Sequence, residues 1–303
     1  MITIVILKIN EISKKFGDTQ ALLNLSFSLD AGEIVGFVGA NGSGKTTTMR
    51  AILGLVRADS GEITFNGKSK SFLDNSFIGY MPEERGLYAK SKVSDQLRYF
   101  GELHGVSRQK SDAKVNELLE RFEIEHFGNR NLSTLSLGNQ QRIQFIAALV
   151  HSPQLLILDE PFNGLDPNAM SQLIAILRDL TAQGVAVLFS SHQLDLVSNL
   201  CDRVVIIDSG IVVAEDSFSN LQMRKEIKYL IVGDNLPQNL ESEFPFVLRY
   251  ESPTEIIATF DRNNYLLERD LLLKTILKSG SLDAFTEIKP PLSEIYRDLL
   301  ARG

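Results

Sequence analysis

The chain has 303 residues with 44% apolar content, a net charge of −7 and an isoelectric point near 5.3. This acidic balance lacks the basic face that nucleic-acid-binding proteins present to phosphates, so nucleic acid is not expected as a partner. No apolar run approaches the roughly 20 residues of a membrane-spanning helix, and the single cysteine cannot form an internal disulfide. We therefore expect a cytosolic chain of two domains that reaches a membrane only through a partner.

The first 30 residues are predicted to form strands. β-branched residues dominate residues 2–9, and apolar residues then alternate with polar ones at Leu23, Leu25, Phe27 and Leu29. The turn between the two stretches carries Phe16. An exposed aromatic ring near a nucleotide can stack on the base, although the same residue could simply cover the edge of a sheet.

A glycine-rich segment, G-A-N-G-S-G-K-T-T, follows the apolar run 34–38 and precedes a helical pattern that continues to Leu55. Glycines let successive backbone N–H groups point at an anion, and the following helix adds the positive end of its dipole. Lys45 would neutralise phosphates, and the Thr46 hydroxyl would ligate Mg²⁺. The alternative is an ordinary strand-to-helix turn. The predicted nucleotide site comprises Gly39, Ala40, Asn41, Gly42, Ser43, Gly44, Lys45, Thr46 and Thr47.

The middle of the chain predicts an α/β core with a helical insertion. Residues 91–127 carry apolar side chains at helical spacing. The apolar runs 155–158 and 185–189 are flanked by helical patterns, as expected for strands covered on both faces of a parallel sheet. Around residue 220 the alternating pattern stops. We expect a nucleotide-binding domain at 1–220, with a helical subdomain at about 88–150, and a small α+β domain at 221–303.

Two further segments could bind a nucleotide. Asp159 and Glu160 end an apolar strand at the sheet edge where ligands collect, so Asp159 could hold Mg²⁺ while Glu160 polarises an attacking water. Ser136 is a suitable N-cap for the helix that follows, whose first N–H groups could face an anion. Each segment alone could also be an ordinary strand end or an ordinary capped helix.

Taken together, the glycine-rich loop, the segment around Ser136, the Asp159–Glu160 pair, the Gly164–Pro167 stretch and His192 after a strand resemble the nucleotide-binding subunit of ABC transporters. The resemblance covers residues 4–217 and implies a P-loop NTPase fold with a parallel core sheet, N-terminal antiparallel strands and a helical subdomain. It implies ATP and Mg²⁺ as ligands, a head-to-tail dimer of two such subunits, and docking of the helical subdomain on a membrane permease.

The resemblance also implies a role for each matching residue. Glu160 would be the general base, His192 would contact the γ-phosphate, and Asp159 would be the metal-binding carboxylate. Phe16 would stack on adenine, and Asp166 would lie at the dimer seam. Ser136 and Gly138 would reach the nucleotide of the partner subunit.

Four positions, in three segments, depart from the family pattern. Leu137 and Asn139 replace glycines in the segment around Ser136, and Ala40 stands where proline is common. Glu83 occupies the place of a glutamine; a carboxylate can still ligate Mg²⁺ but cannot donate a hydrogen bond. The sequences of residues 83–88 and 292–296 resemble those of the branch of sodium and antibiotic exporter ATPases that carry a C-terminal accessory domain.

The sequence thus favours the ATPase subunit of an exporter, bound at the cytoplasmic face of the cell membrane through its permease. The dimer could be a homodimer or could pair with a similar ATPase. The main alternative is a soluble ABC ATPase acting on ribosomes or DNA, which usually has two cassettes or a long coiled-coil insertion. A third alternative is a nucleotide sensor without turnover, with Glu83 as the defect. The transported substrate is not encoded in these motifs.

Overall fold

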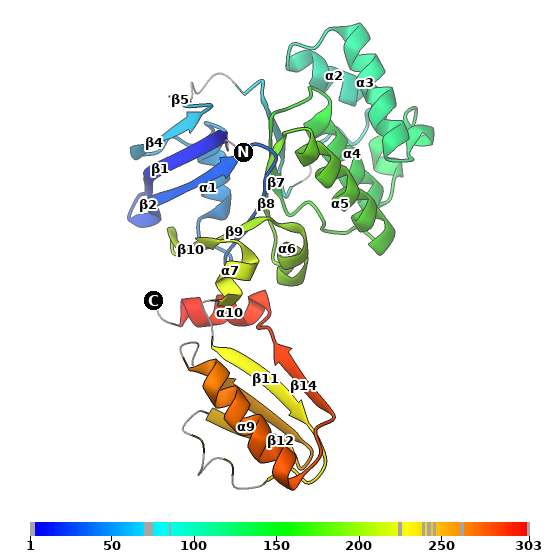
Figure 1. Ribbon diagram of the computed structural model, residues 1–303. Helices are drawn as coiled ribbons and strands as arrows, with labels where there is room; N and C mark the ends of the chain where they lie inside the picture. Colours follow the sequence, from blue (N-terminus) through cyan, green and yellow to red (C-terminus); the bar gives the residue numbers. More distant parts are fainter. Residues whose placement is uncertain are drawn as a thin grey trace. The chain divides into compact units, whose positions relative to one another are not determined.

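The computed structural model describes residues 4–69, 75–84, 86–223, 226–237, 240, 244, 247–260 and 264–301. The chain forms two compact units, Met1–Phe218 with Arg302–Gly303 and Ser219–Ala301 (Figure 1). The predicted assignment of nucleotide binding to 1–220 and of an accessory role to 221–303 stays a prediction. No helix among the described residues is both long and apolar enough to cross a bilayer.

The first unit is built on a six-stranded sheet in the order β10-β9-β3-β8-β7-β6. All neighbouring strands are parallel except β9 and β10. Every residue of β3, β7 and β8 is buried, which explains why the sequence shows continuous apolar runs there. The predicted parallel α/β core is confirmed. The strands are β3 (Ile34–Val38), β6 (Ile78–Met81), β7 (Leu155–Asp159), β8 (Ala186–Ser190), β9 (Arg203–Asp208) and β10 (Ile211–Asp216).

A second, antiparallel sheet forms the N-terminal part and has the order β2-β1-β4-β5. Its strands are β1 (Val5–Phe16), β2 (Thr19–Asp30), β4 (Ser60–Phe65) and β5 (Lys68–Ser69). The expected alternation is wrong at Leu23, which is 42% exposed, while Leu22 is fully buried. Asn24 has a φ of 47°, and this local irregularity shifts the phase of the strand by one residue.

Helices join the two sheets and form the helical insertion (Figure 1). Helix α1 (Lys45–Ile52) buries Met49 and Ile52 in a core shared by both sheets. The insertion is confirmed as helical, with α2 (Val93–Leu103), α3 (Arg108–Arg121), short 3-10 helices at Glu125–Phe127 and Leu132–Thr134, and α4 (Leu137–Leu149). Helices α5 (Pro167–Ala182) and α6 (Leu194–Leu200) follow the strands β7 and β8.

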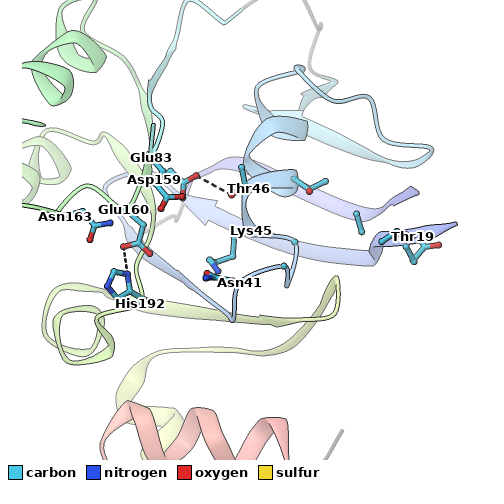
Figure 2. Close-up of a pocket in the computed structure, with 14 residues that line it drawn as sticks. Thr19, Asn41, Lys45, Thr46, Glu83, Asp159, Glu160, Asn163 and His192 are labelled. Atoms are coloured by element: carbon cyan, nitrogen blue, oxygen red, sulfur yellow. Dashed lines mark hydrogen bonds and ion pairs between the residues drawn. The ribbon is translucent and has the colours of Figure 1, made fainter. Parts of the chain in front are cut away.

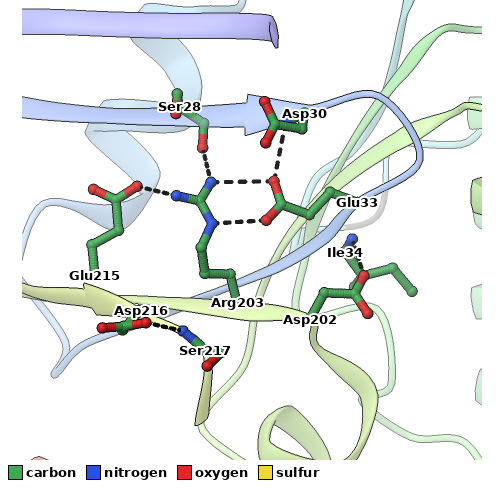
Figure 3. Close-up of polar contacts among 9 residues, drawn as sticks. All are labelled: Ser28, Asp30, Glu33, Ile34, Asp202, Arg203, Glu215, Asp216 and Ser217. Carbon is green, nitrogen blue, oxygen red and sulfur yellow. Dashed lines mark hydrogen bonds and ion pairs between the residues drawn. The ribbon is translucent and has the colours of Figure 1, made fainter. Parts of the chain in front are cut away.

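Charged residues are paired at the amino ends of the parallel strands (Figure 3). Arg203, the first residue of β9, donates from Nε to Glu33 at 2.7 Å and from Nη1 to Glu215 at 2.6 Å. Its Nη2 also donates to the carbonyl oxygen of Ser28. One guanidinium therefore connects the end of β2, the start of β3 and the strand β10.

The second unit is an antiparallel sheet in the order β12-β13-β11-β14 with a helix on one face (Figure 1). Helix α9 packs Leu272 and Ile276, both fully buried, into the core of this unit. The sequence did not indicate β14, whose short Ala284–Ile288 stretch has no fully buried residue. Its elements are α7 (Phe218–Met223), β11 (Ile227–Val232), β12 (Val247–Ser252), β13 (Glu255–Phe260), α9 (Tyr265–Ser279), β14 and α10 (Leu292–Leu300).

Candidate functional site

The glycine-rich loop curls tightly between β3 and α1. A Cβ atom at Gly39 would lie 2.4 Å from the carbonyl oxygen of Ile207, so only glycine fits there. Gly44, the N-cap of α1, has a φ of 109°, which also favours glycine. Lys45 Nζ donates to the carbonyl oxygens of Gly39 at 2.6 Å and Ala40 at 3.0 Å. These two hydrogen bonds hold the Lys45 ammonium group against the loop that carries it.

The environment of Lys45 places a cation among carboxylates. Burial lowers the pKa of Lys45, and the nearby Glu160, Asp159 and Glu83 act in the opposite direction. Among the residues that the structure describes, Lys45 has two carbonyl partners and no ion pair with a carboxylate, so its ammonium group can still attract an anion. The loop can therefore receive phosphate oxygens without first breaking a strong ion pair.

Asp159 and Thr46 supply oxygen atoms suited to a divalent cation. Asp159 ends β7 and is only 3% exposed; its Oδ1 accepts from Ser190 Oγ, and its Oδ2 accepts from Thr46 Oγ1 at 3.4 Å (Figure 2). No group of three or more His, Cys, Asp or Glu side chains gathers in a metal-binding arrangement among the described residues. The oxygen atoms of Asp159 and Thr46 instead suit Mg²⁺, which keeps several waters and usually takes only one or two protein carboxylates.

Glu160 is held in an unusual backbone conformation beside a histidine. Its φ of 52° lies in the left-handed region, which a residue other than glycine adopts only at a cost. Its Oε2 lies 3.0 Å from His192 Nδ1, and its backbone N–H donates to Ser190 Oγ at 3.1 Å (Figure 2). Two contacts and a strained backbone thus fix the position of this carboxylate.

The surroundings make the Glu160 carboxylate a stronger base than an exposed one. Burial raises its pKa; the contact with His192 opposes this effect, and Asp159 and Glu83 add to it. A general base works best when its pKa approaches the working pH. A buried carboxylate with a raised pKa, 3.0 Å from an exposed imidazole, is suited to accept a proton from water.

These groups share one cavity of about 760 Å³ (Figure 2). The loop side chains of Asn41, Lys45 and Thr46 lie on one side, and Asp159, Glu160, Asn163 and His192 lie opposite. The cavity is lined by Thr19, Gln20, Ala21, Asn41, Gly42, Gly44, Lys45, Thr46, Thr47, Glu83, Asp159, Glu160, Asn163 and His192. Loop, paired carboxylates, Glu83 and histidine, which are far apart in the sequence, therefore meet at the carboxyl ends of the parallel strands, as expected.

Other predicted site residues lie outside this cavity. Phe16 is 50% exposed, and Lys14 Nζ lies 5.4 Å from its ring centroid. Ser136 caps α4 by accepting from the N–H of Asn139 at 3.4 Å, and Asp166 caps α5 by accepting from Ala169. These residues, together with Gly138, are absent from the cavity lining, and Gly39, Ala40 and Ser43 of the loop are absent too.

The segment around Gly138 packs against the stretch that follows β7. A Cβ atom at Gly138 would lie 3.0 Å from the carbonyl oxygen of Gly164. Helix α4 therefore begins beside the 164–167 stretch, with Leu137 59% exposed at its tip. The start of α4, for which the sequence predicts anion binding, is therefore exposed at the surface and does not line the cavity of its own chain.

Helix α4 also holds two segments of the cavity wall through buried glutamines. Gln141 donates from Nε2 to the carbonyl oxygen of Glu160 at 3.3 Å. Gln144, one turn later and 3% exposed, donates from Nε2 to the carbonyl oxygen of Pro82 at 2.7 Å, next to Glu83. One rigid helix thus fixes the backbone on both sides of the cavity's carboxylates.

Comparison with known proteins agrees with this geometry. The family described as "ABC transporter" matches residues 22–163. An uncharacterized ABC transporter ATP-binding protein of Bacillus subtilis (strain 168), YhaQ, is 40% identical over 96% of this chain and 97% of its own length. The chain belongs to the family of ABC transporter ATP-binding proteins. Members of this family hydrolyse ATP to power transport, and the chain is an ATP-binding subunit of this kind.

Two further matches agree with the membership in the ABC family. The Nod factor export ATP-binding protein I of Burkholderia lata is 37% identical over 67% of this chain and 68% of its own length. A solved structure described as the ATP-binding subunit of an ABC transporter superposes with a TM-score of 0.67 at 29% identity, covering 72% of this chain and 92% of that one. The predicted ABC ATPase fold is therefore confirmed.

Sequence reasoning missed several residues of this ABC cavity. Thr19, Gln20 and Ala21 begin β2 and line the cavity across from the carboxylates. Asn163 follows Glu160 by three residues and lines it too, with its N–H donating to the Glu160 carbonyl oxygen at 3.2 Å. A signal existed for Asn163, since it lies between two recognised motifs, whereas the start of β2 carries no motif of its own.

Proposed function

We propose that the chain is the ATPase subunit of an exporter and drives a separate integral membrane permease from the cytoplasmic face of the membrane. This direction of transport is supported by the relative named for Nod factor export and by the sequence of residues 83–88, which resembles that of exporter ATPases. The cavity carries the proposal, because it combines a phosphate loop, paired carboxylates and a histidine at one sheet edge.

In this proposal Lys45 and the loop N–H groups bind the outer phosphates of ATP. Glu160 accepts a proton from the attacking water, and His192 contacts the γ-phosphate while it keeps the carboxylate oriented. The raised pKa of Glu160 and its 3.0 Å contact with His192 support these roles. Positioning and charge stabilisation around the phosphates then supply most of the catalysis.

The proposed metal ligands are Thr46 and Asp159, with Glu83 as a further oxygen donor. When bound, Mg²⁺ would neutralise charge on the phosphate oxygens. The oxygen-only donor set, with Thr46 Oγ1 3.4 Å from Asp159 Oδ2, supports this assignment. Glu83 would bind the cation directly or through water, because it lines the same cavity.

The proposed active form is a dimer of this chain with a second copy or with a similar ATPase. Ser136 and Gly138 would reach the γ-phosphate held by the partner, Asp166 would lie at the seam, and Phe16 would stack on adenine. The exposed start of α4 and the absence of these residues from the cavity lining support a site completed in trans.

The decisive experiment replaces Glu160 by Gln, which keeps the shape and removes the base. We expect ATP turnover to fall about a thousandfold while ATP-dependent dimers persist, because general-base catalysis contributes roughly 10²–10⁴. Turnover would be measured by phosphate release and dimers by size-exclusion chromatography, with the exposed Glu62→Gln as the matched control. Turnover retained in Glu160→Gln would refute the role of Glu160.

The partner is tested by affinity capture of the tagged chain from detergent-solubilised membranes. A polytopic membrane protein supports the exporter subunit. Ribosomal proteins would instead support a soluble ABC ATPase and overturn the membrane assignment.

A further inference from the structure

A buried serine lies beside the two carboxylates of the cavity. Ser190 is the last residue of β8, and its side chain is fully buried. The strands β7 and β8 are parallel neighbours, and Ser190 pairs in register with Asp159 at their carboxyl ends. Side chains alternate between the faces of a sheet, so residues that pair in register share a face. The Ser190 hydroxyl therefore reaches the Asp159 carboxylate.

The Ser190 hydroxyl both donates and accepts a hydrogen bond. It donates to Asp159 Oδ1, and it accepts from the backbone N–H of Glu160 at 3.1 Å. An ionised carboxylate can only accept and a backbone N–H can only donate, whereas a hydroxyl can do both. A serine hydroxyl thus matches these two partners, and an aliphatic side chain at this position would leave both without it.

The bond from Ser190 orients the Asp159 carboxylate. It occupies Oδ1, while Oδ2 accepts from Thr46 Oγ1 at 3.4 Å, and both Asp159 and Thr46 line the cavity. Hydrogen bonds to a metal-binding carboxylate fix its orientation, and losing such a partner typically costs about 10–100-fold in metal affinity. Ser190 is therefore placed to control how Asp159 presents its free oxygen.

The second bond of Ser190 holds the strained backbone at Glu160, whose φ is 52°. The carbonyl oxygen of the same residue accepts from Gln141 Nε2 at 3.3 Å and from the N–H of Asn163 at 3.2 Å. These bonds hold the peptide groups on both sides of the Glu160 Cα atom. They therefore fix the direction in which its side chain leaves the backbone, and Ser190 supplies the bond on the N-terminal side.

We propose that Ser190 is a positioning residue, whose single hydroxyl group sets the Asp159 carboxylate and the Glu160 backbone relative to each other. Ser190 does not line the cavity, so it acts through these two partners. The inference rests on the roles proposed above for Asp159 as a metal ligand and Glu160 as the general base. Catalysis by positioned groups is sensitive to small displacements, which makes this one oxygen atom important for turnover.

The central test compares Ser190→Thr with Ser190→Val, since the two side chains have nearly the same shape and only threonine keeps the hydroxyl. We expect Ser190→Val to lower kcat about thirtyfold, the usual effect of losing about two hydrogen bonds, with little change in KM. Ser190→Ala should have the same effect without added volume. Ser190→Thr should stay within about threefold of the unsubstituted chain.

The matched control is Ser111→Ala in α3. Ser111 is also fully buried, and its Oγ donates to the carbonyl oxygen of Arg98 at 3.0 Å, but neither residue lines the cavity. This variant should lose stability in urea unfolding and keep kcat. It therefore separates the loss of any buried hydroxyl from the loss of this one.

Nucleotide binding gives a readout that does not depend on turnover. Isothermal titration calorimetry measures the Kd of a non-hydrolysable ATP analogue in EDTA and in excess Mg²⁺. Ser190→Val and Ser190→Ala should leave the Kd in EDTA unchanged and reduce the gain in affinity on adding Mg²⁺ about tenfold. Ser190→Thr should keep that gain, because its hydroxyl can still orient Asp159.

Two results would overturn the role of Ser190: equal kcat in Ser190→Thr and Ser190→Val, or an unchanged Mg²⁺ gain in Ser190→Val. Failure of the proposed function is recognised separately. If Glu160→Gln keeps its turnover, Glu160 is not the base, whatever the Ser190 variants do. If Glu160→Gln loses its turnover while the Thr and Val variants remain alike, only the role of Ser190 is refuted.

Discussion

The two ends of the parallel sheet use the same kinds of charged residues in opposite ways. At the amino ends, Arg203 is bonded to Glu33 and Glu215 (Figure 3). Burial alone would lower the pKa of Arg203, but its bonds with Glu33 raise it overall. At the carboxyl ends, the pKa of Lys45 is lowered by burial and the pKa of Glu160 is raised by burial.

The opposite pKa shifts indicate that charges at the amino ends stabilise the fold, whereas charges at the carboxyl ends are available to bind a ligand. A cation whose pKa rises in the folded chain gains from its partners, and a carboxylate whose pKa rises is penalised in its charged form. The amino end therefore stabilises the sheet, whereas the carboxyl end keeps charged groups incompletely paired. Such groups cost stability and can interact with a bound ligand instead.

The largest expected effect comes from the paired end. Arg203→Ala should lower the free energy of unfolding by about 3 kcal/mol, because it leaves the mostly buried Glu33 without a counter-charge. Urea unfolding measures this loss. The control is Arg178→Ala, whose ion pair with Asp202 is half exposed and should contribute at most about 0.5 kcal/mol. Equal losses in both variants would contradict the distinction.

Lys45→Met is the matching test at the open end. We expect ATP affinity to fall about a hundredfold, since charge-assisted bonds to phosphate are lost. Unfolding without nucleotide should change little, because burial already disfavours the charged lysine. Isothermal titration calorimetry measures affinity, with the exposed Lys110→Met as the control. An unaltered Kd would remove Lys45 from the phosphate site.

Glu160→Gln should raise the stability of the nucleotide-free chain by about 1 kcal/mol at neutral pH. The sign follows from the raised pKa of Glu160: the folded chain holds this proton more tightly, so stability falls as pH rises from the ordinary carboxyl value of 4.5 through the raised one. The variant should lack that fall. Thermal unfolding measured from about pH 4 to about pH 8, a range that begins near the ordinary carboxyl value, tests this difference; a lower stability for Glu160→Gln would contradict the prediction.

The smallest expected effect concerns Gln144. Gln144→Leu keeps the volume but removes the donor to the carbonyl oxygen of Pro82, so the segment carrying Glu83 is held less firmly. Turnover should fall about threefold with ATP affinity unchanged, in line with the net value of one hydrogen bond. Steady-state kinetics measures both, and Gln109→Leu on the exposed face of α3 is the control. A selective rise in Kd would instead assign Gln144 to nucleotide binding.

Local patterns predicted the parts of this site that depend on neighbours in sequence. The loop 39–47 and the Asp159–Glu160 pair are contiguous, and both follow fully buried strands whose apolar runs are plain in the sequence. Because parallel strands end at one edge, their loops could be expected to meet there. The cavity that joins them agrees with that expectation.

Contacts between distant residues could not be predicted in this way. Arg203 and Glu33 are 170 positions apart, so no spacing relates them. Gln141 and Gln144 look like ordinary polar positions of a helix, and only the packing of α4 shows what they bind. The exposure of Leu23 depends on a single left-handed residue, Asn24, that shifts the strand by one position.

The two glutamines of α4 give the cavity a mechanical property. An α-helix is stiff over the short distance between Gln141 and Gln144, so its turns move as one body. Any rotation or shift of α4 must displace the backbone at Glu160 and at Pro82 together, or break one of the two bonds. The Glu160 segment and the Glu83 segment are therefore coupled through α4, whose exposed first residue is Leu137.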